Sequence, residues 1–356
     1  MSINIIIAFL LSLGMSIFVT RVIIKFSNRA GWGDEPSEER KIHKKRIPNL
    51  GGIAVFMGTM IAYFAFSDYS NSIRPDKLFS ISIFLFFIGV KDDLEPVIPW
   101  KRLFFEFICA FFIIYITDIR LTTLWGIFGI HELPIGLSYV LTSVFIVGCI
   151  NAYNLIDGVD GLLASISLLG TICFGFIFKF SNEWLWTLLC ISMMGSLSGF
   201  LIYNWQPSRI FMGDGGALFL GTIFACFSLR IMQLPPIHWD HFTMSAPHTL
   251  AFSIIAIPVV DMIFVFLFRV TKGISPFKAD NKHCHHRLMK LGFNHEKVTI
   301  ILLFANISII LLAYYMQNTG ALRSLIYTFL YCSFLEFILI FLGWLNTKKD
   351  RLKMNN

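Results

Sequence analysis

Eleven apolar runs separated by short polar loops limit what this chain can fold into. Most runs approach the roughly 20 residues that an α-helix needs to cross a bilayer, and the shorter ones fit helices only partly exposed to lipid. Only 14% of the 356 residues are charged, well below the roughly 25% of a soluble domain. We therefore predict an all-α, polytopic integral membrane protein with a single transmembrane domain, residues 1–356. The predicted spans are Ile3–Ile24, Gly52–Ser67, Leu78–Val90, Leu103–Ile116, Ile135–Ile150, Leu162–Phe178, Trp184–Tyr203, Ala217–Met232, Leu250–Phe268, Val298–Tyr315 and Ser324–Leu345.

Positive charge sets the expected orientation. Lys and Arg crowd into the loops after the first, third, ninth and eleventh runs, and the loops on the other side hold only isolated cases. Because cytoplasmic loops carry the excess of Lys and Arg, we expect the N-terminus outside and the C-terminus inside. The third and fourth runs are short, which leaves a ten-span alternative open. The net charge of +7 then follows from topology, and we expect contact with membrane lipids and none with nucleic acid.

The loops on the basic side contain nearly every residue that could perform chemistry. The stretch Asn151–Leu162, NAYNLIDGVDGL, places two acids and two asparagines between apolar runs, although a charge at bilayer depth costs roughly 2.5–3.5 kcal/mol. Aspartates gathered in one cleft repel one another unless a cation shares it, and Mg²⁺ binds carboxylates, waters and substrate phosphates. The candidate aspartates are Asp92, Asp93, Asp157, Asp160 and Asp214.

Each motif also has a simpler interpretation. Asp214, just before an apolar run, is typical of a helix N-cap, and the adjacent acids Asp92 and Asp93 are typical of a solvated helix end. For His283–His286, HCHH, a functional and a structural role stay open. A zinc site there is disfavoured, because consecutive side chains point to different faces and the seven cysteines form no CxxC pair. Acids, histidines and glycine turns together on one side favour a phosphate-bearing substrate bound with Mg²⁺.

Five motifs in order resemble the polyprenyl-phosphate N-acetylhexosamine-1-phosphate transferases. They read VKDDLEP, NAYNLIDGVDGL, FMGDGGALFLG, PVVD and KGISPFKADNKHCHHRLMKLGF, and the match runs from Lys41 to Phe293. The resemblance implies a bacterial inner-membrane enzyme with a cytoplasm-facing site, which moves a sugar 1-phosphate from a UDP-sugar to undecaprenyl phosphate and releases UMP. The HCHHRL run lacks the Glu of the MraY-type branch, which makes a peptidoglycan intermediate. The chain therefore looks like the WecA/TagO-type branch, which uses UDP-N-acetylglucosamine.

The resemblance also implies roles for residues at matching positions. Asp214, with Asn154 nearby, would hold Mg²⁺ on the nucleotide pyrophosphate, with Mn²⁺ as a substitute. Lys101 would meet the lipid phosphate. The residues with implied catalytic roles are Asp92, as acid/base or nucleophile, with Asp93 beside it, and Asp157 and Asp160, which would bind the nucleotide or position the metal. Contacts to the pyrophosphate and sugar are expected from His43, Lys45, Asn151, His283, His285, His286 and Arg287.

Two mechanisms and two rival functions stay open at this point. Asp92 would deprotonate the lipid phosphate for direct attack on the β-phosphorus, or an Asp would form a covalent intermediate. We favour direct attack, because a phosphate monoester with a second pKa of about 6 ionises readily at neutral pH. The rivals are an MraY-type transferase and a secondary transporter, whose ion site would lie near the bilayer midplane. The glycan that the product starts, O-antigen, teichoic acid or another, and a homodimer are also open.

Overall fold

The computed structural model describes residues 2–30, 47–67, 75–239, 242–275 and 282–354. Two residues expected at the site, His43 and Lys45, lie outside these ranges. The described chain is mostly helical, which confirms the all-α prediction, and it includes one small antiparallel hairpin. The elements are α1 Ser2–Ala30, α2 Gly51–Phe66, α3 Asp76–Leu94, α4 Pro99–Thr117, η1 Ile127–Gly129, α5 Ile135–Ile156, α6 Leu162–Phe180, α7 Trp184–Asn204, α8 Gly213–Met232, β1 Ile237–Trp239, β2 Phe242–Met244, α9 Pro247–Ile254, α10 Ala256–Thr271, α11 Cys284–Lys290, α12 His295–Met316, η2 Gln317–Thr319 and α13 Ala321–Met354.

Ten of the eleven predicted spans each fall on one helix, and the ninth falls on the two helices α9 and α10. By length and apolar character, seven of the described helices could cross a membrane, or up to eight if α9 and α10 form one bent span. Helices α3 and α4 are 19 residues long; α3 carries charged residues at both ends and α4 carries them near its start. Helix α2 is a shorter apolar helix. The structure also adds a short helix, α11, within the last basic loop, where we expected no helix.

The ninth predicted span is broken, because a proline removes one backbone donor. Helices α9 and α10 meet at Ile255 with a bend of 76°. Pro258 has no N–H group to donate to the carbonyl of Ile254, four residues earlier. The side-chain amide of Asn306, on α12, donates to that carbonyl at 3.2 Å instead. The break therefore costs no unpaired backbone group at this carbonyl.

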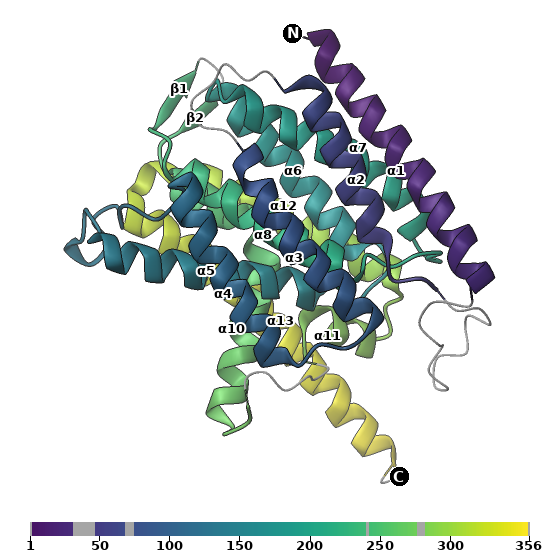
Figure 1. Cartoon of the computed structure of the whole chain (residues 1–356). Helices are drawn as coiled ribbons and strands as arrows, with labels where there is room; N and C mark the ends of the chain where they lie inside the picture. The colour runs from purple at the N-terminus through teal and green to yellow at the C-terminus, as the bar shows by residue number, and fades with distance from the viewer. Residues whose placement is uncertain (1, 31–46, 68–74, 240–241, 276–281, 355–356) are drawn as a thin grey trace.

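Helix α8 lies at the centre of the bundle, among α2, α3, α5 and α9 (Figure 1). Its most apolar stretch is 94% buried, whereas that of the outer helix α13 is 17% buried. The outer helices expose large apolar side chains, among them Phe18 on α1 and Phe337 on α13. Such a surface suits lipid tails and would be unfavourable in water.

Glycines let two neighbours approach the first turn of α8. A Cβ atom on Gly52 of α2 would lie 2.3 Å from the Gly216 Cα atom, and one on Gly89 of α3 would lie 2.6 Å from the Gly215 Cα atom. Only glycine allows this backbone spacing. The FMGDGG motif therefore brings the start of α2 and the end of α3 against the start of α8.

The loops that we expected on the basic side gather at one end of the bundle. The segment before α2 pairs with the segment before α8, because the Phe211 N–H donates to the Pro48 carbonyl at 2.8 Å and the Gly51 N–H donates to the Phe211 carbonyl at 2.9 Å. The hairpin of β1 and β2 and the N-terminal end of α1 lie at the opposite end (Figure 1). The loops on the expected basic side form the site described next.

Candidate active site

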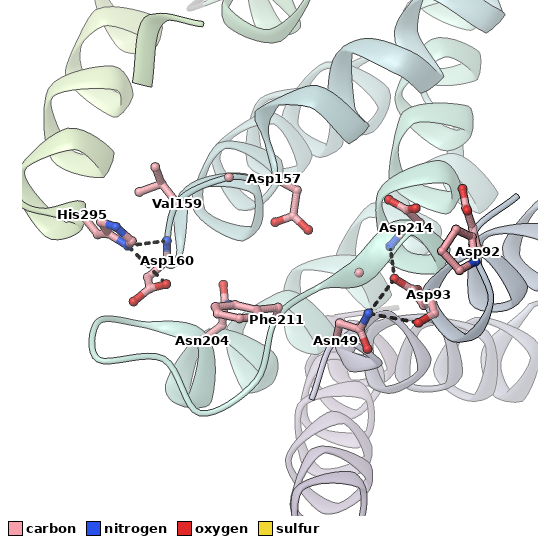
Figure 2. Close-up of a pocket in the computed structure, with 13 residues that line it drawn as sticks. Asn49, Asp92, Asp93, Asp157, Val159, Asp160, Asn204, Phe211, Asp214 and His295 are labelled. Carbon is pink, nitrogen blue, oxygen red and sulfur yellow. Dashed lines mark hydrogen bonds and ion pairs between the residues drawn. The ribbon is translucent and has the colours of Figure 1, made fainter. Parts of the chain in front are cut away.

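A cavity of about 500 Å³ opens at the end of the bundle where α3, α5 and α7 finish and α2, α6, α8 and α12 begin (Figure 2). All five candidate aspartates line it. The lining residues are Asn49, Asp92, Asp93, Pro96, Asp157, Gly158, Val159, Asp160, Asn204, Phe211, Gly213, Asp214 and His295. Residues up to 246 positions apart in sequence therefore contribute to one cavity, as the alternating loops predicted.

Asp93 caps the N-terminus of α8. Its Oδ1 accepts the Asp214 N–H at 2.9 Å, its Oδ2 accepts the Gly215 N–H at 3.1 Å, and the Asn49 amide lies 3.3 Å from Oδ1. A carboxylate is favourable here because these amides have no partner within the helix. Burial nevertheless raises the pKa of Asp93 to about 7, the two backbone hydrogen bonds oppose this, and the charges of Asp214 and Asp92 add to it.

Asp92 and Asp214 face each other across one guanidinium group. Arg102 Nη1 lies 3.0 Å from Asp92 Oδ2 and 3.6 Å from Asp214 Oδ2. The Val97 N–H donates to Asp92 Oδ1 at 2.7 Å, and the Asn154 amide donates to Asp214 Oδ1 at 2.5 Å. Asp214 stays one-third exposed, so one of its oxygens can also meet a ligand.

Asp157 and Asp160 take different surroundings although only two residues separate them. Asp157 turns toward Asp214, whereas Asp160 lies on the other side of the cavity beside His295 (Figure 2). Burial raises the pKa of Asp157 to about 7, and the charges of Asp214 and Asp93 add to this. Burial also acts on Asp160, but the pKa of Asp160 is lowered because hydrogen bonds from His295 and Ser208 outweigh it.

A buried glutamate supports the cavity from behind. Glu106 of α4 is 1% exposed, and its Oε1 lies 3.4 Å from Arg102 Nε. Its Oε2 accepts the Asn151 amide at 2.5 Å. Asn151, expected to contact the pyrophosphate, thus lies in this supporting layer and is not among the described residues that line the cavity. Lys101 is exposed and also outside that lining, so its role at the lipid phosphate stays a prediction.

The histidine cluster packs behind the loop of residues 157–160. Asp261, the acid of the PVVD motif on α10, accepts the Cys284 N–H at 2.7 Å and pairs with His283 Nδ1 at 2.7 Å. His285 lies against Gly158, where an added Cβ atom would come within 2.6 Å of the ring Nε2. Burial, with the neighbouring charge of His286, lowers the pKa of His285 to about 3, so its ring is neutral.

Arg287 forms an ion pair within the protein. Its Nη1 pairs with Glu336 of α13 at 2.8 Å. The described residues that line the cavity do not include His283, His285, His286 or Arg287, which were expected to contact the pyrophosphate and sugar. The structure thus separates the expected site residues into an acid-lined cavity and a histidine layer directly behind one of its loops.

The cavity has the donor set that a hard divalent cation requires. Asp92, Asp157 and Asp214 offer carboxylate oxygens from three elements, and Mg²⁺ prefers oxygen ligands together with substrate phosphates. Burial raises the pKa of Asp157, and the charges of Asp214 and Asp93 add to this, as expected where several carboxylates share one cavity. The residues present therefore fit Mg²⁺.

Sequence reasoning missed Arg102, Glu106, Asn49 and His295, and it gave Asn204 no role. One signal was available: Arg102 and Glu106 stand four residues apart at the start of an apolar run, where an i,i+4 ion pair is expected. His295 begins α12 outside the motifs that we considered, and no local pattern places it beside Asp160. Asn204, which accepts the Gly161 N–H at 3.1 Å, shows its role only in three dimensions.

The fold and the cavity define a polytopic membrane protein with an acid-lined cavity at one end of its helices. A family model described as glycosyl transferase family 4 matches residues 77–232, which include all five aspartates. A Bacillus subtilis (strain 168) protein named probable undecaprenyl-phosphate N-acetylglucosaminyl 1-phosphate transferase is 28% identical over 347 residues, 97% of this chain and 94% of that protein.

Two further relatives are more similar over a shorter stretch. Both are named undecaprenyl-phosphate alpha-N-acetylglucosaminyl 1-phosphate transferase. The Yersinia pestis protein is 31% identical over 313 residues, 86% of this chain and 81% of that protein. The Escherichia coli (strain K12) protein is 30% identical over 288 residues, 79% of this chain and 75% of that protein. The chain therefore belongs to glycosyl transferase family 4, as its motifs predicted.

Proposed function

We propose that this chain transfers N-acetylglucosamine 1-phosphate from UDP-N-acetylglucosamine to undecaprenyl phosphate and releases UMP. The observation that carries the proposal is the convergence of five aspartates from α3, α8 and the loop between α5 and α6 on one cavity. The names of the relatives, which specify undecaprenyl phosphate and N-acetylglucosamine, support the substrates. The product would start a lipid-linked glycan at the cell surface, such as O-antigen or teichoic acid.

The acids would hold Mg²⁺ through Asp214 and Asp157, with Asn154 fixing Asp214 by the hydrogen bond described above. When bound, such an ion neutralises the pyrophosphate oxygens and the charge that develops on the departing UMP. Asp93 would act indirectly, because both of its carboxylate oxygens already accept backbone N–H groups at the start of α8. It therefore positions Asp214 instead of touching the substrate.

Direct attack by the lipid phosphate is the mechanism that we favour. The acceptor is mostly dianionic at neutral pH, because its second pKa is about 6, and Asp92 would accept the remaining proton at its carboxylate. Arg102 lies beside Asp92 and would attract the acceptor phosphate. Holding both substrates in one open cavity makes the exchange of one phosphoanhydride for another mainly a matter of position and charge.

The chain is a multi-pass membrane protein by its apolar helices, and we place it in the bacterial inner membrane with the cavity toward the cytoplasm. The distribution of Lys and Arg supports this orientation, and UDP-sugars are made in the cytoplasm. The acids lie at helix ends and not in the middle of the bundle, which favours the transferase over the transporter.

The test is UMP release by the purified full chain in lipid nanodiscs with UDP-N-acetylglucosamine, undecaprenyl phosphate and Mg²⁺. Asp214→Asn should lower this rate roughly 10²–10³-fold, the scale on which one electrostatic contact acts, with the protein still folded. Asp118→Asn, an exposed acid at the opposite end, is the matched control and should keep full activity.

Three results would count against the proposal. Full activity in Asp214→Asn would remove the metal assignment. Activity with UDP-N-acetylmuramoyl-pentapeptide alone would move the chain to the MraY-type branch. Exchange of labelled UMP into UDP-N-acetylglucosamine without lipid would show a covalent intermediate and overturn direct attack.

A further inference from the structure

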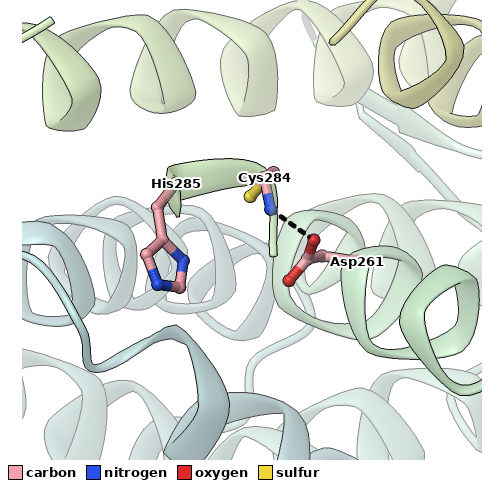
Figure 3. Close-up of side chains that lie close together, drawn as sticks. All are labelled: Asp261, Cys284 and His285. Atoms are coloured by element: carbon pink, nitrogen blue, oxygen red, sulfur yellow. Dashed lines mark hydrogen bonds between the residues drawn. The ribbon is translucent and has the colours of Figure 1, made fainter. Parts of the chain in front are cut away.

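Three metal-ligating side chains of different chemical types meet behind the acid-lined cavity. The carboxylate of Asp261, the thiol of Cys284 and the imidazole of His285 have ligand atoms within 4.8 Å of one another, and all three residues are buried (Figure 3). Asp261 comes from α10, whereas Cys284 and His285 come from the start of α11. The group is separate from the carboxylates that line the cavity.

Asp261 links α10 to the first turn of α11. We expected adjacent side chains of HCHH to point to different faces, yet the ligand atoms of Cys284 and His285 lie within 4.8 Å of each other. Asp261 fixes the first turn of α11 by accepting the Cys284 N–H at 2.7 Å, while His283 Nδ1 pairs with its other oxygen at 2.7 Å. Each carboxylate oxygen has two acceptor positions, so each keeps one for a further partner.

His285 supplies an independent sign that a ligand belongs here. It is 1% exposed, and its Nδ1 has no hydrogen-bond partner among the described residues. Its Nε2 faces Gly158, and Figure 3 shows a ring nitrogen turned to the side on which Cys284 and Asp261 lie. A buried polar atom without a partner costs about 1–3 kcal/mol, and a neutral imidazole is a good metal ligand.

We propose that Asp261, Cys284 and His285 form a binding site for Zn²⁺ or a similar soft divalent metal, separate from the oxygen-lined cavity that fits Mg²⁺. Tetrahedral Zn²⁺ bonds of about 2.0–2.3 Å place ligand atoms about 3.5 Å apart, so ligand atoms that lie within 4.8 Å of one another need to approach by at most roughly 1 Å. Binding forms a sulfur–metal bond, and the Cys284 thiol proton passes to solvent. Water takes the fourth position.

The two sites differ by ligand type and should select different ions. Thiolate and imidazole ligands favour Zn²⁺ and Co²⁺, whereas Mg²⁺ takes oxygen ligands and keeps its waters. The proposal does not depend on the transferase activity, because the readouts below measure metal binding. A metal here would tie α10 to α11 and, through His285, lie directly behind the loop of residues 157–160.

The experiment is a Co²⁺ titration of the full chain, metal-stripped and purified in detergent with a histidine-free tag. We expect a thiolate-to-cobalt charge-transfer band that Zn²⁺ abolishes by displacement. Cys284→Ala and Cys284→Ser should each remove this band and weaken Zn²⁺ binding at least tenfold. Cys226→Ala changes another fully buried thiol, on α8, and should leave both readouts unchanged.

Further variants separate the site from its neighbours and from simple unfolding. His285→Gln should also weaken Zn²⁺ binding at least tenfold, while Asp214→Asn, in the acid-lined cavity, should keep the cobalt–thiolate band. Thermal unfolding without metal should be similar in wild type and Cys284→Ser, whereas Zn²⁺ should raise the midpoint only in wild type. Equal Zn²⁺ affinity in wild type and Cys284→Ala, or a cobalt spectrum without the thiolate band, would overturn the proposal.

Discussion

At the scale of single residues, Arg102 is the side chain on which the acid cluster most depends. Its guanidinium lies near Asp92, Glu106 and Asp214, and Nη2 also lies 3.4 Å from the Asn154 amide oxygen. A planar group with five donors can meet several acceptors at once, whereas an ammonium group acts as one point charge. The arrangement therefore calls for arginine and not merely for a positive charge.

Arg102→Lys should lower UMP release at least tenfold, because an ammonium group makes fewer contacts than the guanidinium and leaves Asp214 and Glu106 less well paired. We expect a smaller effect on the thermal unfolding midpoint, since one charge remains. Arg120→Lys is the matched control, because Arg120 pairs with Asp118 at the opposite end of the bundle. Equal activity of Arg102→Lys and wild type in steady-state assays would show that the guanidinium geometry is dispensable.

The sequence predicted the acids of the site but not Arg102, their partner, because the direction of one side chain decides which basic residue faces them. Asp92, Asp93, Asp157, Asp160 and Asp214 stand out because acids next to apolar runs are costly. Lys101 and Arg102 are adjacent, and choosing between them requires knowing which face of α4 meets α3 and α5. That face follows from packing with helices far along the chain, which no local pattern gives.

At the scale of elements, the position of the site depends on how closely α2 and α3 approach α8. The contact surfaces are glycines, so backbone meets backbone and neither side can yield by changing a rotamer. The sequence showed glycines beside Asp214 and at the start of the second run. Their role in helix packing could not be predicted, because each of these glycines packs against a glycine in another segment of the chain.

Gly52→Ala tests this packing directly. The added Cβ atom would lie 2.3 Å from the backbone of Gly216, so α2 must move away from α8, at a cost of roughly 1–3 kcal/mol. We expect a lower thermal unfolding midpoint and lower transferase activity. Gly148→Ala, on α5, meets only the Met262 side chain at 3.8 Å and should be neutral or slightly stabilising. Similar midpoints for the two variants would contradict the packing argument.

At the scale of the whole molecule, the pattern of alternate loops predicted which segments would come together. All-helical architecture and one polar end follow from apolar runs and charge, which are properties of the entire chain. The break between α9 and α10 could have been predicted from Pro258, but its hydrogen bond from Asn306 could not. The position of α11 does not follow from the sequence either, because it depends on the contact with Asp261. Sequence therefore located the acid-lined cavity better than the histidine layer behind it.

The acid cluster gives the whole protein a pH dependence that a divalent cation should change. In the metal-free protein, the pKa values of Asp93 and Asp157 rise from 3.8 to about 7. Groups with a raised pKa stabilise the fold when protonated, and this contribution is lost as the pH rises from about 4 through about 7. The lowered pKa of Asp160 acts below about pH 4, outside this window. The shift of His285 opposes the aspartates below about pH 6.5, with or without Mg²⁺.

The quantity to measure is therefore the Mg²⁺-induced rise in the thermal unfolding midpoint, because the His285 contribution cancels in that difference. Protons and metal compete for the same carboxylates, so the rise should be large at about pH 8 and small at about pH 5.5. At a hundredfold excess over Kd, binding contributes about 2.7 kcal/mol of stability. Asp214→Asn should lose most of the rise at about pH 8, and Asp118→Asn should keep it. An equal rise at both pH values would mean that Mg²⁺ binds elsewhere. If the carboxylates of this cavity are its ligands, they take up protons at the lower pH and bind Mg²⁺ less tightly.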